Sequence, residues 1–214
     1  MMVQKYLICM IIQVANKMTN YKEFISNYLN DQSSCLKELS NETDLLALVV
    51  EKLIHARSSD SIIITMGNGG SASTASHFAA DLLKTAILKD EKRFHAICLT
   101  DNIPVLTAWA NDTSYDEMFK EQLKNFIKKD TIVVAFSGSG TSKNVIKALE
   151  LAKNSGAYLI GFTGIHGGDF PQICDICIKI PSSDMLTIES FHLMMCHVIT
   201  SCLRETGTPE FSYE

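Results

Sequence analysis

The sequence predicts an α/β protein, a three-layer αβα sandwich built on a doubly wound parallel sheet, with helices before the sheet. Continuous β-branched apolar runs at 61–66 and 131–136 are typical of strands buried on both faces, as in a parallel sheet. Each run leads into a glycine- and serine-rich turn and then into apolar residues at helical spacing. The same strand, turn and helix order therefore occurs twice, as repeated units with right-handed crossovers require.

The remaining elements continue this alternation. Two segments of helical period, 21–39 and 43–57, precede the first strand, and Ser40-Asn41 between them can cap the second. Further strands are expected at 94–99, 158–163 and 173–180, and further helices at 103–110, 115–128 and 185–204. This order predicts an N-terminal helical extension (1–58), one α/β domain (59–205) and a C-terminal tail (206–214).

The extreme N-terminus contains an apolar stretch, Tyr6 to Val14, that follows Lys5. The stretch is too short to span a bilayer, Gln13 interrupts it, and no convincing cleavage site follows. We interpret it as a helix or a start-site extension, with Met18 as an alternative initiator, and expect no membrane partner.

Composition limits the partners and the compartment. The chain has 214 residues, enough for a core that needs neither disulfide nor metal, and its net charge of -5 argues against a nucleic-acid partner. Its seven cysteines are odd in number and unevenly spaced, which favours reduced thiols in a cytoplasmic protein. Cys174 and Cys177 have C-x-x-C spacing, but they lie in an apolar run without a second pair, so packing is favoured over a redox or metal role.

The two glycine- and serine-rich turns are the candidate binding loops. The first is Gly67-Asn68-Gly69-Gly70-Ser71 and the second is Ser137-Gly138-Ser139-Gly140-Thr141-Ser142. Each opens a helix, where unpaired N–H groups and the positive end of the helix dipole attract an anion. Neither loop fits the P-loop or the dinucleotide pattern, which argues against a nucleoside triphosphate or NAD. Since ligands of such sheets bind beyond the carboxyl ends of the strands, the two loops indicate a sugar-phosphate site.

An ordered set of motifs resembles the sugar isomerase (SIS) domain of phosphoheptose isomerases over residues 20–205. The residues that carry this resemblance are Gly67 to Ala72, His77 to Leu82, Asn111-Asp112 with Tyr115-Asp116 and Phe119, Ser137 to Ser142 before Asn144 to Ala148, Phe162 to Gly164 with Gly167-Gly168, and His197. The resemblance implies that sedoheptulose 7-phosphate is isomerised to D-glycero-D-manno-heptose 7-phosphate, for heptose in bacterial surface polysaccharides. It also implies a cytoplasmic homotetramer with active sites between subunits.

The resemblance also implies roles for particular residues. The substrate phosphate would lie among Ser137, Gly138, Ser139 and Ser142. The sugar would lie among Asn68, Gly69, Gly70 and Ser71, with its hydroxyls bound by Asn111 and Asp112. His77, Asp81, Glu189 and His197 match the catalytic and metal-site positions of the family.

Those four side chains suit two kinds of chemistry. An enediol route needs an acid and a base, and our hypothesis assigns these roles to Asp81 and His197, with Glu189 as a further participant. His77 and Asp81 are spaced i,i+4 on one helix face, whereas Glu189 and His197 are two turns apart and diverge by roughly 80°. The same four residues suit zinc, although no short metal motif joins them. His192, on another helix face, is expected to be a packing or surface residue.

Departures from the family pattern leave alternatives open. Asp81 and Glu189 stand where the family usually has Glu and Gln, and Gly138 and Thr141 stand where Thr and Asn are common. One alternative is an isomerase of a different sugar phosphate. Another is a non-catalytic SIS-domain regulator that binds the replication initiator DnaA, although the presence of His77 together with an acid–base pair favours an enzyme.

Overall fold

The structure is a computed structural model that describes residues 2–212, and the side chains of residues 20–212. The chain forms two compact units, Met1–Ser40 and Asn41–Glu214. The first unit contains one helix, α1 (Met2–Leu39), of 38 residues. The apolar stretch from Tyr6 to Val14 and the segment expected at 21–39 are parts of this one helix, while the segment expected at 43–57 is a separate helix of the second unit. Lys37 lies in the last turn of α1, where a cation is favourable beside the exposed carbonyl groups.

The second unit is built on a five-stranded parallel sheet of order β2-β1-β3-β4-β5. The strands are β1 (Ile62–Gly67), β2 (His95–Cys98), β3 (Ile132–Phe136), β4 (Tyr158–Thr163) and β5 (Ile176–Lys179). The order reverses at β1 and β3, which confirms the doubly wound prediction and makes the space beyond their carboxyl ends the switch point where ligands of such folds bind. Gly67 pairs with Phe136 in register, so the two candidate loops leave the sheet side by side.

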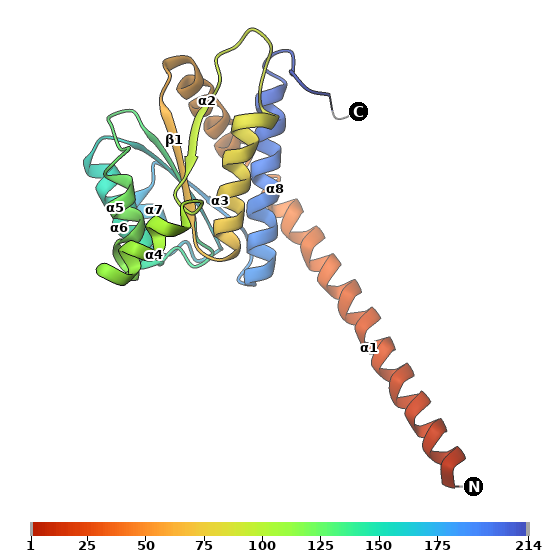
Figure 1. Ribbon diagram of the computed structural model, residues 1–214. Coiled ribbons are helices and arrows are strands. Elements are labelled where there is room, and N and C mark those ends of the chain that lie inside the picture. Colours follow the sequence, from red (N-terminus) through yellow and green to blue (C-terminus); the bar gives the residue numbers. More distant parts are fainter. Residues whose placement is uncertain (1, 213–214) are drawn as a thin grey trace. The chain divides into compact units, whose positions relative to one another are not determined.

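Helices cover both faces of this sheet (Figure 1). One group consists of α2 (Thr43–Ser59), α3 (Gly70–Ala80) and α8 (Met185–Arg204); the other consists of α4 (Ile103–Asp112), α5 (Met118–Leu123), α6 (Lys143–Asn154) and α7 (Phe170–Ile173). Successive side chains of β1 point toward these two groups of helices in turn. Thr65 donates a hydrogen bond to the Ala75 carbonyl of α3, while Ile64 and Met66 pack toward α5 and α6. Three layers result, as predicted.

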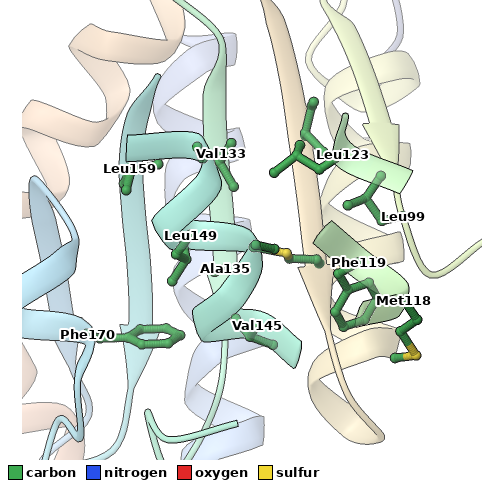
Figure 2. Close-up of a cluster of buried hydrophobic side chains, with 14 residues drawn as sticks. Leu99, Met118, Phe119, Leu123, Val133, Ala135, Val145, Leu149, Leu159 and Phe170 are labelled. Carbon is green, nitrogen blue, oxygen red and sulfur yellow. The ribbon is translucent and has the colours of Figure 1, made fainter. Parts of the chain in front are cut away.

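The core on the second of these faces is a cluster of fully buried apolar side chains (Figure 2). Phe119 of α5, Leu149 of α6 and Phe170 of α7 pack against Val133 and Leu159 of the central strands. Apolar burial of this kind is the dominant favourable term in folding, and here it fixes the start of α6 relative to β3. The loop between β3 and α6 is thereby held at both ends.

Two boundaries differ by more than two residues from the sequence prediction, and one helix ends in an unexpected turn. The helix expected at 115–128 is a 3-10 turn (η2, Tyr115–Glu117) followed by the short α5. The strand expected at 173–180 begins only at Ile176, because the short helix α7, with a proline in its first turn, extends as far as Ile173. The helix after the first loop ends in a π-helical turn, η1 (Asp81–Thr85), closed by Ala86 N–H donating to the Asp81 carbonyl at 2.8 Å.

Helix α8 has the predicted bounds, and Asp184 begins it by accepting a hydrogen bond from the Thr187 N–H at 2.8 Å. Among the described residues it is the one helix whose length and composition would suffice to cross a membrane, but 50% of that window is buried within the fold. It contacts α2 and α3, so it packs as a core helix.

Candidate active site

The first loop turns the chain from β1 into α3 within two residues. Gly69 has φ 56° and ψ -125°, a backbone conformation that favours glycine. The Ala72 and Ser73 N–H groups bond back to carbonyls of Asn68 and Gly69, so the turn is rigid. Ser71 is buried at the start of the helix. The loop therefore leaves the side chain of Asn68 as its principal polar group.

The second loop gathers three hydroxyls before α6. Ser137 Oγ lies 3.0 Å from Ser142 Oγ and 3.4 Å from Ser139 Oγ. Gly140 has φ 66°, and a Cβ there would overlap the Gly167 carbonyl oxygen, so the loop requires glycine. The structure thus brings together the predicted phosphate residues Ser137, Ser139 and Ser142 at the positive end of a 12-residue helix.

The two loops are joined by side chains. Asn68 Nδ2 donates to Asn144 Oδ1 and Asn144 Nδ2 donates to Asn68 Oδ1, both at 2.9 Å. Tyr115 Oη donates to Asn68 Oδ1 at 2.8 Å. Neither Asn144 nor Tyr115 received a role from the sequence; the signal that could have found Asn144 is a polar side chain in the otherwise apolar face of α6.

A cavity of about 260 Å³ lies beside this junction. Asn68 and Gly69 line it from the first loop, and Ala110, Tyr115 and Phe119 line it from the other side. A larger hollow of about 690 Å³, lined in part by Asp60, His95 and Lys128, lies at the amino ends of the strands. The smaller cavity is the better candidate, because ligands of open parallel sheets bind beyond the carboxyl ends.

A second group of polar side chains lies where α3 meets α8. His77 Nε2 is 3.0 Å from His197 Nε2, and Asp81 Oδ2 is 3.6 Å from the first and 3.9 Å from the second. Among the described residues, these three form the group of His, Cys, Asp and Glu side chains whose ligand atoms all lie within 4.8 Å of one another. The i,i+4 spacing aligns His77 with Asp81, and side-by-side packing of the two helices supplies His197 (Figure 1).

The carboxylate of this group indicates a cation. Asp81 Oδ2 is buried and accepts no hydrogen bond within the described residues. A buried carboxylate oxygen without a partner is costly unless a cation compensates it. Two imidazole nitrogens and one carboxylate oxygen, with His77 and His197 about half exposed, are a donor set that fits a divalent metal with an open coordination position.

The other predicted site residues lie apart from this cluster. Glu189 is half-buried on α8, and its carboxylate lies against Gly70, where an added Cβ would overlap it. It therefore faces the first loop and is not within the three-residue cluster. Asn111 and Asp112 are exposed at the end of α4, where Asn111 Nδ2 donates to Asp112 Oδ1 at 2.8 Å.

His192, Cys174 and Cys177 are neutral at neutral pH. His192 is fully buried, with its ring centroid 5.9 Å from Phe136 and 6.1 Å from Phe162, and burial lowers its pKa to about 4. Its expected packing role is confirmed. Burial also raises the pKa of Cys174 to about 12 and that of Cys177 to about 11, which leaves both thiols protonated and poorly reactive.

Comparison with known proteins gives a consistent result. Residues 27–164 match the SIS domain family. The phosphoheptose isomerase of Helicobacter pylori (strain P12) is 35% identical over 182 residues, which cover 85% of this chain and 92% of that protein. A probable phosphoheptose isomerase of Thermoplasma acidophilum is 38% identical over 157 residues, covering 73% and 86%. The structure of phosphoheptose isomerase GmhA from Neisseria gonorrhoeae superposes with a TM-score of 0.80 at 26% identity, covering 86% of this chain and 98% of that one.

Proposed function

Because the chain belongs to the SIS domain family and, within it, to the phosphoheptose isomerases, we propose that it interconverts sedoheptulose 7-phosphate and D-glycero-D-manno-heptose 7-phosphate. The protein is a sugar-phosphate isomerase, and the non-catalytic regulator is not favoured, since the relatives named above are isomerases. The observation that carries the proposal is the junction of the two loops at the switch point, with Asn68 bonded to Asn144.

The second loop holds the substrate phosphate. The hydroxyls of Ser137, Ser139 and Ser142 converge there, and Gly138 gives the loop room to pack against Met185 of α8, whose sulfur an added Cβ would overlap. The main-chain N–H groups of Ser142, Lys143 and Asn144 have no acceptor within residues 20–212, so they can donate to phosphate oxygens. Neutral donors and the helix dipole together bind a dianion without a lysine inside the loop.

The sugar extends from this loop toward the first loop, where Asn68, Gly69, Gly70 and Ser71 line its site and Asn111 and Asp112 bind its hydroxyls. Isomerisation removes a proton from the carbon beside the carbonyl, protonates the carbonyl oxygen, and returns a proton to the neighbouring carbon. In metal-free protein, Asp81 takes the carbon-bound proton and His197 protonates the oxygen, a division that suits a buried carboxylate and an exposed imidazole. Glu189 faces the sugar loop and is the further participant.

The His and Asp cluster also fits zinc. His77 Nε2, His197 Nε2 and Asp81 Oδ2 would hold the ion, and Glu189 remains a proposed fourth ligand that needs to move from Gly70. Bound zinc would polarise the substrate carbonyl. In that state both imidazole Nε2 atoms are ligands and cannot transfer protons, so Asp81 Oδ1 is the cluster atom that remains free to accept one. Metal content therefore decides which residues act as acid and base.

We further propose that the protein is a cytoplasmic homotetramer and that its product supplies heptose for a bacterial surface polysaccharide. Leu186, Met194 and Val198 are apolar yet 65%, 39% and 39% exposed on α8. They lie on the helix that carries Glu189 and His197, so a second subunit that covered them would also cover the catalytic cluster. This supports active sites between subunits.

The test is a turnover assay with sedoheptulose 7-phosphate and a panel of other ketose phosphates, with and without added zinc. We expect sedoheptulose 7-phosphate to be converted, and Asp81→Asn to lower kcat by about 100-fold or more, as removal of a general base does. Asp130→Asn, an exposed change at the other end of the sheet, is the matched control and should retain activity. Conversion of another sugar alone would replace the proposed substrate, and full activity in Asp81→Asn would reject the assigned base.

A further inference from the structure

Asn144 is buried at the point where the two loops meet. The residue is only 1% exposed. It lies in the first turn of α6, directly after the phosphate loop. Its amide exchanges two hydrogen bonds with Asn68, 76 residues earlier in the chain. A buried amide is retained only when its donors and acceptors are satisfied, so this pair is a specific connection between the loops.

The hydrogen bonds around Asn144 fix the direction of both amides. The Val145 N–H donates to Asn144 Oδ1 at 3.0 Å, and a main-chain N–H can only donate. This bond places Oδ1 of Asn144 toward Val145 and Asn68 Nδ2, and it leaves Asn144 Nδ2 to donate to Asn68 Oδ1. Tyr115 Oη donates to that same Asn68 oxygen, which occupies both of its lone pairs.

One side-chain group of Asn68 then remains available. Its oxygen is fully used and one of its two N–H bonds is directed to Asn144, so the second N–H is the group that Asn68 can offer to a ligand. Asn68 is half-buried and lines the cavity of about 260 Å³, so a ligand there can reach it. A donor at this place selects an oxygen acceptor, such as a sugar hydroxyl or carbonyl.

We propose that Asn144 is a positioning residue that fixes the Asn68 side chain as an N–H donor to a sugar oxygen. It also holds this donor at a fixed distance from the phosphate loop. The Tyr115 hydroxyl completes the arrangement through its hydrogen bond to Asn68. The inference rests on the proposed function for the identity of the ligand. It assigns to the side chain of Asn144 no contact with substrate. A merely structural Asn144 would cap the first turn of α6 through Val145 and would need no bond to Asn68.

Asn144→Asp tests this directly, because it keeps the shape and the acceptor for Val145 while it replaces the donor to Asn68 by an oxygen. Asn68 Oδ1 then faces another acceptor, so the Asn68 amide is no longer held in this orientation. We expect KM for the sugar phosphate to rise at least about tenfold, as the loss of a buried hydrogen bond predicts, with kcat less affected. The inhibition constant of inorganic phosphate, which probes the phosphate loop alone, should also rise, because the variant adds a negative charge beside that loop. The positioning role is therefore measured by the rise of KM beyond the rise of this constant.

Two further variants sharpen the comparison. Asn154→Asp, an exposed change on the same helix, should leave both constants unchanged. Tyr115→Phe removes one bond to Asn68 and should raise KM by about threefold, without a further rise when combined with Asn144→Asp, because contacting residues of one network are not additive. If Asn144→Asp fails to fold, Tyr115→Phe, which alters an exposed side chain, decides by the same two constants.

Each outcome has one meaning. A parallel rise of KM and of the phosphate inhibition constant would show that Asn144 supports the helix N-terminus only, and unchanged constants would show no role; either rejects the inference. Absence of turnover in the unmodified protein rejects the proposed function instead. In that case the same variants are compared by calorimetric Kd for the sugar phosphate and for inorganic phosphate, so the positioning role is still decided.

Discussion

The Nε2 atoms of His77 and His197 lie 3.0 Å apart, although 120 residues separate them in the chain. At this distance one neutral ring donates to the other, or both direct their lone pairs at a common cation. Asp81 Oδ2 lies within 3.9 Å of both nitrogens and has no hydrogen bond among the described residues. The geometry therefore makes metal content the first quantity to measure.

Protein purified without added metal should contain about one zinc per chain by elemental analysis, since three ligands with an open position suffice for a catalytic site. His77→Ala and His197→Ala should each lose the metal, and EDTA should lower the Tm of the unmodified protein, because a ligand of the native state stabilises it. His166→Ala, in an exposed loop, should keep the metal. Equal zinc content in all four proteins would locate the ion elsewhere.

Asp81→Asn should separate activity from stability. In metal-free protein the change removes a buried carboxylate that lacks a hydrogen-bond partner at Oδ2, so Tm should stay the same or rise while turnover falls. Asp81→Glu restores the carboxylate with one more methylene and should keep activity within about tenfold of the unmodified protein. A large loss of Tm in metal-free Asp81→Asn would mean that the carboxylate has a stabilising partner.

The burial of His192 should make stability depend on pH. Its folded pKa of about 4 lies below the usual value of 6.5, so between these values the unfolded chain binds more protons and the free energy of unfolding falls as the pH falls. The full effect is about 3 kcal/mol, present above pH 6.5 and lost toward pH 4.

Denaturant titrations across this range should show a flatter pH dependence for His192→Phe, which keeps an apolar ring between Phe136 and Phe162. The slope is compared and not the absolute stability, since the larger ring changes packing. His166→Phe is the matched exposed control and should leave the slope unchanged. An unchanged slope in His192→Phe would assign the pH dependence to other groups.

Gly70→Ala should destabilise the protein through Glu189. An added Cβ would overlap the Glu189 carboxylate, so the loop or the side chain has to shift, at a cost of about 1–3 kcal/mol. Glu189→Ala removes the obstacle, so the double variant should recover most of the lost stability in denaturant titrations. Additive losses would place the strain in the backbone of the first loop and not at this contact.

Much of the fold follows from local pattern. The apolar runs before each loop are β1 and β3, and α8 begins and ends at the residues that its periodicity indicates. The strand expected at 173–180 was wrong at its start, because an apolar run does not distinguish a short helix from a strand.

Less of the candidate site could be predicted from the sequence pattern. The i,i+4 spacing of His77 and Asp81 predicts that they lie close together. The proximity of His77 and His197 was expected only from the family resemblance, since periodicity within one helix does not show which helix packs beside it. The Asn68–Asn144 bonds depend in the same way on packing between distant segments. The ligand roles, including that of Glu189, stay predictions.

Helix α8 is the last helix among the described residues, and it supplies His197. A growing chain that ends before it offers only His77 and Asp81, a pair on one turn that binds a metal weakly. The proposed zinc site therefore forms only when α8 packs against α3. A variant that lacks α8 is expected to bind zinc weakly and to have no turnover.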